Sequence, residues 1–272
     1  DRIASTLKQH ELPVPKVIAT YPEKSWMIQS DMGDQMLADI LPLRHVQAKD
    51  YMQAMDLLIS AQTKLQHTQT QWPTYTASFL QKELELFPTW YCAQHQQQAL
   101  SPYELAIFSK VAKRLIQQAL IQPQSWVHRD FHSRNLIWSS ASSSLGMVDF
   151  QDAVWGPVTY DIVSLLKDCY IDFDEKERLT CIHYYQNMLE LHRIIPAMST
   201  SLFHQYIDWM GIQRHLKCLG IFARLYHRDG KNQYIKEMPR VWKALIKAIR
   251  PYPELHDLLS LLTNRVPYPC VP

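Results

Sequence analysis

The chain has 272 residues, of which 47% are apolar and 20% are charged. This composition is typical of a folded globular protein that is long enough for two lobes. The formal net charge of +2 gives no electrostatic reason to expect nucleic acid or an anionic membrane as a partner. No apolar run of about 18 residues predicts a membrane span. The five scattered cysteines favour reduced thiols in a cytoplasmic protein.

The first 34 residues predict a helix and two strands. Residues 1–10 have a helical pattern, and Lys16–Thr20 and Ser25–Gln29 predict short strands around a turn. Ser30–Asp34 then predicts another turn. The chain opens in what reads as the middle of a helix, without a start methionine, so we expect the natural protein to begin earlier.

Helices dominate the rest of the chain. From about residue 45 one helical face carries Tyr51, Met55, Leu58, Ile59 and Leu65. Ser101, Pro102 and Glu104 form a capping box. We expect its helix to direct inward Leu105, Phe108, Ala112, Leu115 and Ala119. Strand-like runs follow at 126–127, 136–138 and 145–150. Further helices are predicted at about 159–170, 175–192, 199–227, 238–249 and 254–263.

The strand-like cluster contains the pattern with the clearest chemical meaning. His128-Arg129-Asp130 is followed by Asn135 and then by Asp149, fourteen residues further on. Phosphoryl transfer requires a group that orients the attacking hydroxyl, and Mg2+ requires hard oxygen ligands. The spacing matches the kinase catalytic loop and its metal-binding aspartate. It predicts Asp130 as the catalytic base, Asn135 and Asp149 as Mg2+ ligands, and His128 and Arg129 as supports of the loop.

At these residues the chain resembles the aminoglycoside phosphotransferase/choline kinase superfamily. Gly156-Pro157 followed by Asp161 fits that superfamily, and the segment lacks the glycine and activation loop of protein kinases. A closer resemblance is to the bacterial anomeric N-acetylmuramate/N-acetylglucosamine kinase family. Three stretches carry it: HRDFHSRNL, VDFQDAVWGPVTYDIVSLLKDCY and, at residues 211–225, GIQRHLKCLGIFARL.

The resemblance implies an α+β, protein-kinase-like fold of the aminoglycoside phosphotransferase type. Residues 1–34 are then the remainder of a truncated, β-containing N-lobe with its hinge, and residues 35–272 are a mostly helical C-lobe. The implied activity is ATP-dependent phosphorylation of an amino sugar in cell-wall recycling. The resemblance also implies that Ser30, Asp31 and Met32 meet adenine and that Asp161 braces the catalytic loop.

One departure from the family concerns the nucleotide. The chain has six glycines and no glycine-rich phosphate-binding motif, and the family's phosphate-covering hairpin is absent from these residues. We therefore expect a truncated protein or a fragment that binds ATP poorly or not at all by itself.

Four residues are candidates for acceptor binding, each with a structural alternative. His132 lies inside the loop, and Gln151 and Asp152 follow the metal aspartate. Arg214 suits bidentate binding of a carboxylate such as the lactyl group of N-acetylmuramate. Gln213–His215 can equally be a polar network that braces the core, because unpaired polar groups are costly in an apolar helix.

Two other functions remain open. An aminoglycoside or choline-type amino-alcohol kinase calls for an acidic pocket, and the chain offers Asp168, Asp172 and Asp174. An inactive kinase-like fragment fits the missing hairpin, but it does not account for the retained metal ligands. The sequence leaves the oligomeric state open.

Overall fold

The structure, a computed structural model, describes residues 2–41, 46–139, 143–171, 173–266 and 268. The chain folds into two compact units. The first contains residues 1–74 and 123–203, and the second contains residues 75–122 and 204–272. The N-terminal residues thus belong with the strand cluster, and the division at residue 34 stays a prediction.

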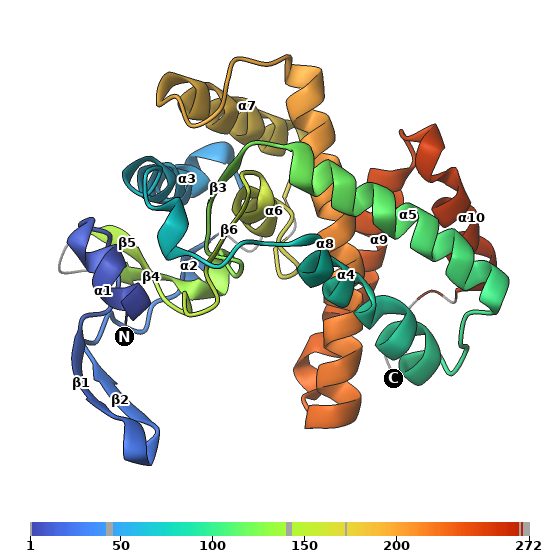
Figure 1. Ribbon diagram of the computed structural model, residues 1–272, viewed down its shortest axis with the longest axis horizontal. Coiled ribbons are helices and arrows are strands. Elements are labelled where there is room, and N and C mark those ends of the chain that lie inside the picture. The colour runs from blue at the N-terminus through green and yellow to red at the C-terminus, as the bar shows by residue number, and fades with distance from the viewer. Residues whose placement is uncertain (1, 42–45, 140–142, 172, 267, 269–272) are drawn as a thin grey trace. The chain divides into compact units, whose positions relative to one another are not determined.

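The first unit begins with helix α1 (Arg2–Gln9) and a β-hairpin, shown in blue in Figure 1. Strands β1 (Val17–Tyr21) and β2 (Trp26–Gln29) pair antiparallel around a short helical turn, which confirms the two predicted strands. Ser25 closes the turn in the left-handed region, with φ 52°. Large apolar side chains on this hairpin, including Ile18 and Trp26, are exposed.

Helix α3 (Ala48–Lys64) packs against α7 (Glu175–Leu191) (Figure 1). A short helix α2 (Leu37–Ile40) precedes α3 in the chain. The backbone N–H of Ala48 donates to Glu177 Oε2 at 2.7 Å, so the start of α3 is tied to the first turn of α7. The predicted apolar face of α3 is confirmed, because every one of its members is buried: Tyr51, Met55, Leu58, Ile59 and Leu65.

Four short strands form two antiparallel pairs. Strand β3 (Gln124–Val127) pairs with β6 (Val154–Pro157), and β4 (Leu136–Ser139) pairs with β5 (Ser144–Met147). The three predicted strand runs are confirmed in place. The last one ends at Met147 rather than at residue 150, because Asp149 has φ 66° and an extended strand cannot pass through a left-handed residue.

Strand β6 escaped prediction because Gly156 and Pro157 read as a break. Pro157 is tolerated since it is the last residue of the strand, where no further ladder bond is needed. Helix α6 (Tyr160–Leu166) follows, and it is shorter than predicted because Lys167 leaves helical geometry. Cys169 and its neighbours therefore lie outside the helix.

The segment between α1 and α2 lies on the β4–β5 hairpin. Met147 N–H donates to the Pro13 carbonyl at 2.9 Å, and Trp138 N–H donates to the Gln35 carbonyl at 2.8 Å. Gly146 makes the close approach possible. A Cβ at this position would lie 2.3 Å from Met32 Cε and 2.9 Å from the Pro13 carbonyl oxygen.

The second unit is helical within the described residues. It contains α4 (Ala77–Leu84), a π-helical segment (Phe87–His95), α5 (Pro102–Ile121), α9 (Met238–Ile249) and α10 (His256–Arg265). It also contains α8 (Thr200–Asp229) from residue 204 onward. The predicted helices at 175–192, 199–227, 238–249 and 254–263 are confirmed, whereas α4 and the π-helical segment were not predicted.

The predicted capping box at the start of α5 is confirmed. Ser101 Oγ accepts from Glu104 N–H at 3.3 Å, and the Glu104 carboxylate accepts from Ser101 N–H at 2.8 Å. The inward position predicted for Leu105 is wrong, because its side chain is 43% exposed. The other four predicted positions are buried, and Glu104 lies on their face of the helix at the position expected for Leu105.

No helix among the described residues is both long and apolar enough to cross a membrane. The four cysteines that the structure describes are all buried and form no disulfide with one another.

Candidate active site

The loop with the phosphotransferase pattern connects β3 to β4. Its first half is held by the carboxylate of Asp161, in the first turn of α6. His128 N–H donates to Asp161 Oδ2 at 2.6 Å, and Arg129 N–H donates to Oδ1 at 3.0 Å. Arg129 has φ 78°, a strained conformation for a residue with a side chain. Two charge-assisted hydrogen bonds to neighbouring amides stabilise this turn.

Asp130 is fixed by its own backbone. Its N–H donates to His128 Nδ1 at 3.3 Å, and its carbonyl accepts from His132 N–H and from Asn135 Nδ2, both at 3.0 Å. These bonds use only main-chain atoms of Asp130, so its carboxylate takes no part in them. The Asn135 amide nitrogen donates to the Asp130 carbonyl, so the amide oxygen is the atom that Asn135 can offer to a cation.

His128 is fully buried beneath the loop. Burial lowers the pKa of its imidazole to about 4, against an ordinary value of 6.5. The ring is therefore neutral at physiological pH, with Nδ1 as a hydrogen-bond acceptor for Asp130 N–H. This arrangement makes His128 a support of the loop geometry.

We expect the free energy of unfolding to fall as the pH drops from 6.5 to 4. The unfolded chain protonates His128 first, so acid favours the unfolded state, and stability is regained above pH 6.5. The loss reaches about 3 kcal/mol, since each pH unit is worth about 1.4 kcal/mol. Urea unfolding at several pH values checks this. His128→Asn, which keeps an acceptor near Nδ1, should show a shallower pH dependence, and an equal slope would contradict the prediction.

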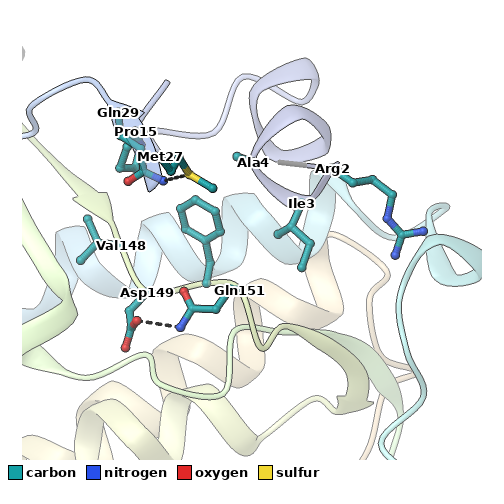
Figure 2. Close-up of a pocket in the computed structure, with 10 residues that line it drawn as sticks. Arg2, Ile3, Ala4, Pro15, Met27, Gln29, Val148, Asp149 and Gln151 are labelled. Atoms are coloured by element: carbon teal, nitrogen blue, oxygen red, sulfur yellow. Dashed lines mark hydrogen bonds between the residues drawn. The ribbon is translucent and has the colours of Figure 1, made fainter. Parts of the chain in front are cut away.

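Asn135 and Asp149 come together from the two ends of the β4–β5 hairpin. Val148 N–H donates to the Asn135 carbonyl at 3.0 Å, and Asn135 Nδ2 lies 3.5 Å from Asp149 Oδ2. Gln151 Nε2 donates to Asp149 Oδ1 at 2.8 Å, as Figure 2 shows. Asp149 is exposed. The pair thus presents one carboxylate and one amide to solvent.

This donor set fits Mg2+, which prefers oxygen ligands and usually keeps several waters or phosphate oxygens. Among the described residues no group of three or more His, Cys, Asp and Glu side chains is placed to hold a metal ion. A site with two protein ligands is therefore suited to a metal that a phosphorylated ligand also holds.

Asp149 lines a pocket of about 650 Å3 (Figure 2). It is lined by Arg2, Ile3 and Ala4 from α1, by Met27 and Gln29 from β2, and by Pro15 and residues 148–151. Its volume lies within the range of about 300–1,000 Å3 common for small-molecule sites. Arg2 places a positive charge at its wall.

The residues expected to meet adenine lie where the chain leaves β2. Ser30 Oγ accepts from Lys16 N–H, and Asp31 Oδ1 accepts from Gly33 N–H, both at 2.8 Å. Asp31 and Met32 line another pocket, of about 680 Å3, together with Trp138. Their role toward a nucleotide stays a prediction.

Three of the four candidate acceptor residues gather around the loop. Gln151 binds Asp149, and the Asp152 carboxylate lies 3.9 Å from Arg129 Nη1. The His132 ring lies edge-on to Tyr170, with centroids 5.7 Å apart. The fourth candidate, Arg214, belongs to the second unit, where it is buried in α8.

The polar residues of α8 take part in a buried network of the second unit. Glu83 accepts from Gln213 Nε2 at 3.0 Å and forms an ion pair with Lys217 Nζ at 2.9 Å. It also accepts from the Tyr75 hydroxyl. Buried polar groups need such partners, so Gln213 has the structural role that was one of its two interpretations.

The structure shows a contact to the loop that the sequence did not predict. Asp168, suggested there as part of an acidic pocket, instead accepts hydrogen bonds from Ser133 and from Tyr170 N–H. Asp174 caps the start of α7, and Asp172 lies outside the described residues. The sequence gives no local signal for the Asp168 contact, because Ser133 and Asp168 are 35 residues apart.

A loop aspartate held through its backbone, with an asparagine and a second aspartate beside it at a pocket, is the arrangement expected in a kinase-type phosphotransferase. The chain belongs to the phosphotransferase enzyme family, whose family model matches residues 1–195. It is 36% identical to the N-acetylmuramate/N-acetylglucosamine kinase of Pseudomonas aeruginosa, over 97% of this chain and 76% of that protein. The kinase of the same name from Pseudomonas putida is 34% identical, over 95% of this chain and 75% of that protein.

Solved structures of small-molecule kinases share the fold. The ethanolamine kinase of Plasmodium vivax superposes with a TM-score of 0.60 at 14% identity, over 90% of this chain and 71% of that one. An amicoumacin kinase bound to AMP-PNP and Ca2+ gives a TM-score of 0.56 at 15% identity, over 94% of this chain and 79% of that one. The predicted protein-kinase-like α+β fold class is confirmed.

Proposed function

We propose that this chain carries the catalytic loop of an ATP-dependent kinase that phosphorylates the anomeric hydroxyl of N-acetylmuramate or N-acetylglucosamine. The observation that carries the proposal is the convergence of Asp130, Asn135 and Asp149 on one loop and hairpin. The names of the two Pseudomonas relatives supply the acceptor class. A cytoplasmic location, where ATP is available, is part of the proposal.

Asp130 is the catalytic residue of this proposal. Its carboxylate orients the sugar hydroxyl and accepts its proton as the oxygen attacks phosphorus. Asp161 and His128 hold the loop so that the carboxylate stays in place. Arg129 supports the turn from the other side through Asp152, whose carbonyl lies 3.5 Å from Arg129 Nη1.

Asn135 and Asp149 are the residues that would hold Mg2+. When bound, this ion neutralises charge on the phosphates and aligns them with the acceptor. The pocket beside Asp149 is where we place the nucleotide phosphates, with Ser30, Asp31 and Met32 toward adenine. The AMP-PNP complex of the amicoumacin kinase supports nucleotide use by this fold.

We assign the acceptor to His132, Gln151 and Asp152, whose polar groups suit the hydroxyl and amide groups of an amino sugar. Gln151 also lines the pocket in which we place the nucleotide phosphates, so it is the residue that would meet both ligands. Arg214 is proposed to pair with the lactyl carboxylate of N-acetylmuramate. Asp168 and Asp174 both have structural partners, which weakens the case for a cationic acceptor.

The test is a coupled kinase assay on the full-length protein that contains this chain. The acceptors are N-acetylmuramate, N-acetylglucosamine, choline and an aminoglycoside, and 31P NMR identifies the phosphorylated position. We expect turnover of one or both amino sugars with phosphate on the anomeric oxygen. Turnover of choline or the aminoglycoside alone would refute the acceptor assignment, and no turnover of any acceptor would refute the kinase assignment.

A further inference from the structure

The catalytic loop has a second anchor, formed by residues just after α6. We propose that Asp168, together with Tyr170, is a positioning residue that fixes the second half of the loop and thereby the metal ligand Asn135. The inference rests on the proposed function of Asn135. It assigns a role to Asp168 that is distinct from the bracing of the first half by Asp161.

Asp168 is bound at both of its carboxylate oxygens. Its Oδ2 accepts from Ser133 Oγ at 2.6 Å and from Ser133 N–H at 3.1 Å. Its Oδ1 accepts from Tyr170 N–H at 3.0 Å. The side chain is buried, with 6% of the residue exposed. A buried carboxylate with three donors has one orientation, so it fixes the position of Ser133.

Tyr170 adds a second contact to the same half of the loop. The Arg134 guanidinium lies over its ring, 3.6 Å from the centroid, and His132 approaches the ring edge-on at 5.7 Å. A cation over an aromatic face is attracted by the negative charge of the ring face. Residues 132–134 are thus held from two directions by the segment 168–170.

The position of Asn135 depends on this anchor. Ser133–Asn135 is a single turn of 3-10 helix, so Ser133 and Asn135 belong to one rigid turn. Asn135 N–H donates to the His132 carbonyl at 2.9 Å, and its side chain donates to the Asp130 carbonyl. If Ser133 moves, the turn moves with it, and the Asn135 side chain leaves its place beside Asp149.

The experiment compares Asp168→Asn with the parent in the full-length protein. The amide presents a donor where the carboxylate accepts, so at least one of the three hydrogen bonds is lost. We expect faster deuterium exchange in peptides that cover residues 132–136. We also expect about tenfold weaker binding of Mn2+ in the presence of ATP, measured by electron paramagnetic resonance, since supporting partners of metal ligands typically contribute 10- to 100-fold.

Asp174→Asn is the matched control. Asp174 also accepts from backbone amides, those of Lys176 and Glu177, but it caps α7 and does not contact the loop. It should leave exchange at 132–136 and Mn2+ affinity at parent values. Equal Mn2+ affinity in Asp168→Asn and in the parent would overturn the proposal.

Two milder variants keep the test decisive if Asp168→Asn fails to fold. Ser133→Ala removes the shorter hydrogen bond and retains the N–H donor, and Tyr170→Leu removes the ring but keeps its N–H. Each should weaken Mn2+ binding by a few-fold while the variant remains folded, and unchanged binding in both would reject the role of this anchor. These measurements do not depend on the sugar. A parent that phosphorylates neither amino sugar therefore refutes the acceptor assignment while the Asp168 comparison stands.

Discussion

Replacing Asp130 with Asn is expected to lower the turnover number of the kinase by about 100- to 10,000-fold, the usual contribution of a general base. The amide keeps the size of the side chain but cannot accept the proton of the acceptor hydroxyl. The variant keeps the backbone hydrogen bonds of residue 130 with His128 Nδ1 and Asn135 Nδ2, so we expect it to fold. Steady-state kinetics at saturating sugar and ATP measure the effect.

Asp257→Asn is the control for this variant. It removes an exposed carboxylate that pairs with Lys110 at 2.9 Å, in the other unit of the chain, and should leave turnover within about twofold of the parent. Unfolding in urea verifies that both variants remain folded. If Asp130→Asn turns over within tenfold of the parent, another group takes the proton, and the assignment of Asp130 as base is wrong.

Lys217→Met should destabilise the protein by about 3–5 kcal/mol, because it removes a cation that pairs with the buried Glu83 carboxylate. Both side chains of this pair are almost inaccessible, 7% and 6% exposed. Methionine is close to lysine in length and fills the apolar part of the space, so the cost reports on the charge rather than on a cavity. The free energy of unfolding in urea measures the loss.

A matched comparison separates the effect of burial on stability from the effect of removing a lysine charge. Lys110→Met breaks the exposed pair with Asp257, and it should cost no more than about 1 kcal/mol. Adding Glu83→Gln to Lys217→Met should recover part of the lost stability, since the carboxylate that paired with Lys217 is then replaced by a neutral amide. A Lys217→Met variant as stable as Lys110→Met would mean that water or another group compensates Glu83.

The catalytic half of the site was predictable because its members are close in sequence. Asp130, Asn135 and Asp149 span twenty residues, and short strands between them restrict the geometry, so spacing alone indicates their meeting. The same reasoning located β1, β2 and the capping box at Ser101, where local backbone chemistry decides the structure.

Long-range partners were harder to predict. Asp168 reaches Ser133 across 35 residues of sequence, and neither residue belongs to a motif that announces the contact. The same holds for Glu83 and Gln213, which are 130 residues apart. Leu105 shows a different difficulty. Because one residue turns a helix by about 100°, choosing Leu105 instead of Glu104 moved a side chain from core to surface.

The close approach of Pro13 and Met32 to Gly146 limits which substitutions this part of the protein can accept. Mutant libraries can vary Met32, whose flexible end is able to move away from residue 146. They cannot enlarge residue 146 in the same way, because the Pro13 carbonyl oxygen belongs to the backbone and lies 2.9 Å from the first added carbon. Gly146 is therefore a position to hold constant, and diversity is better introduced on the Met32 side of the contact.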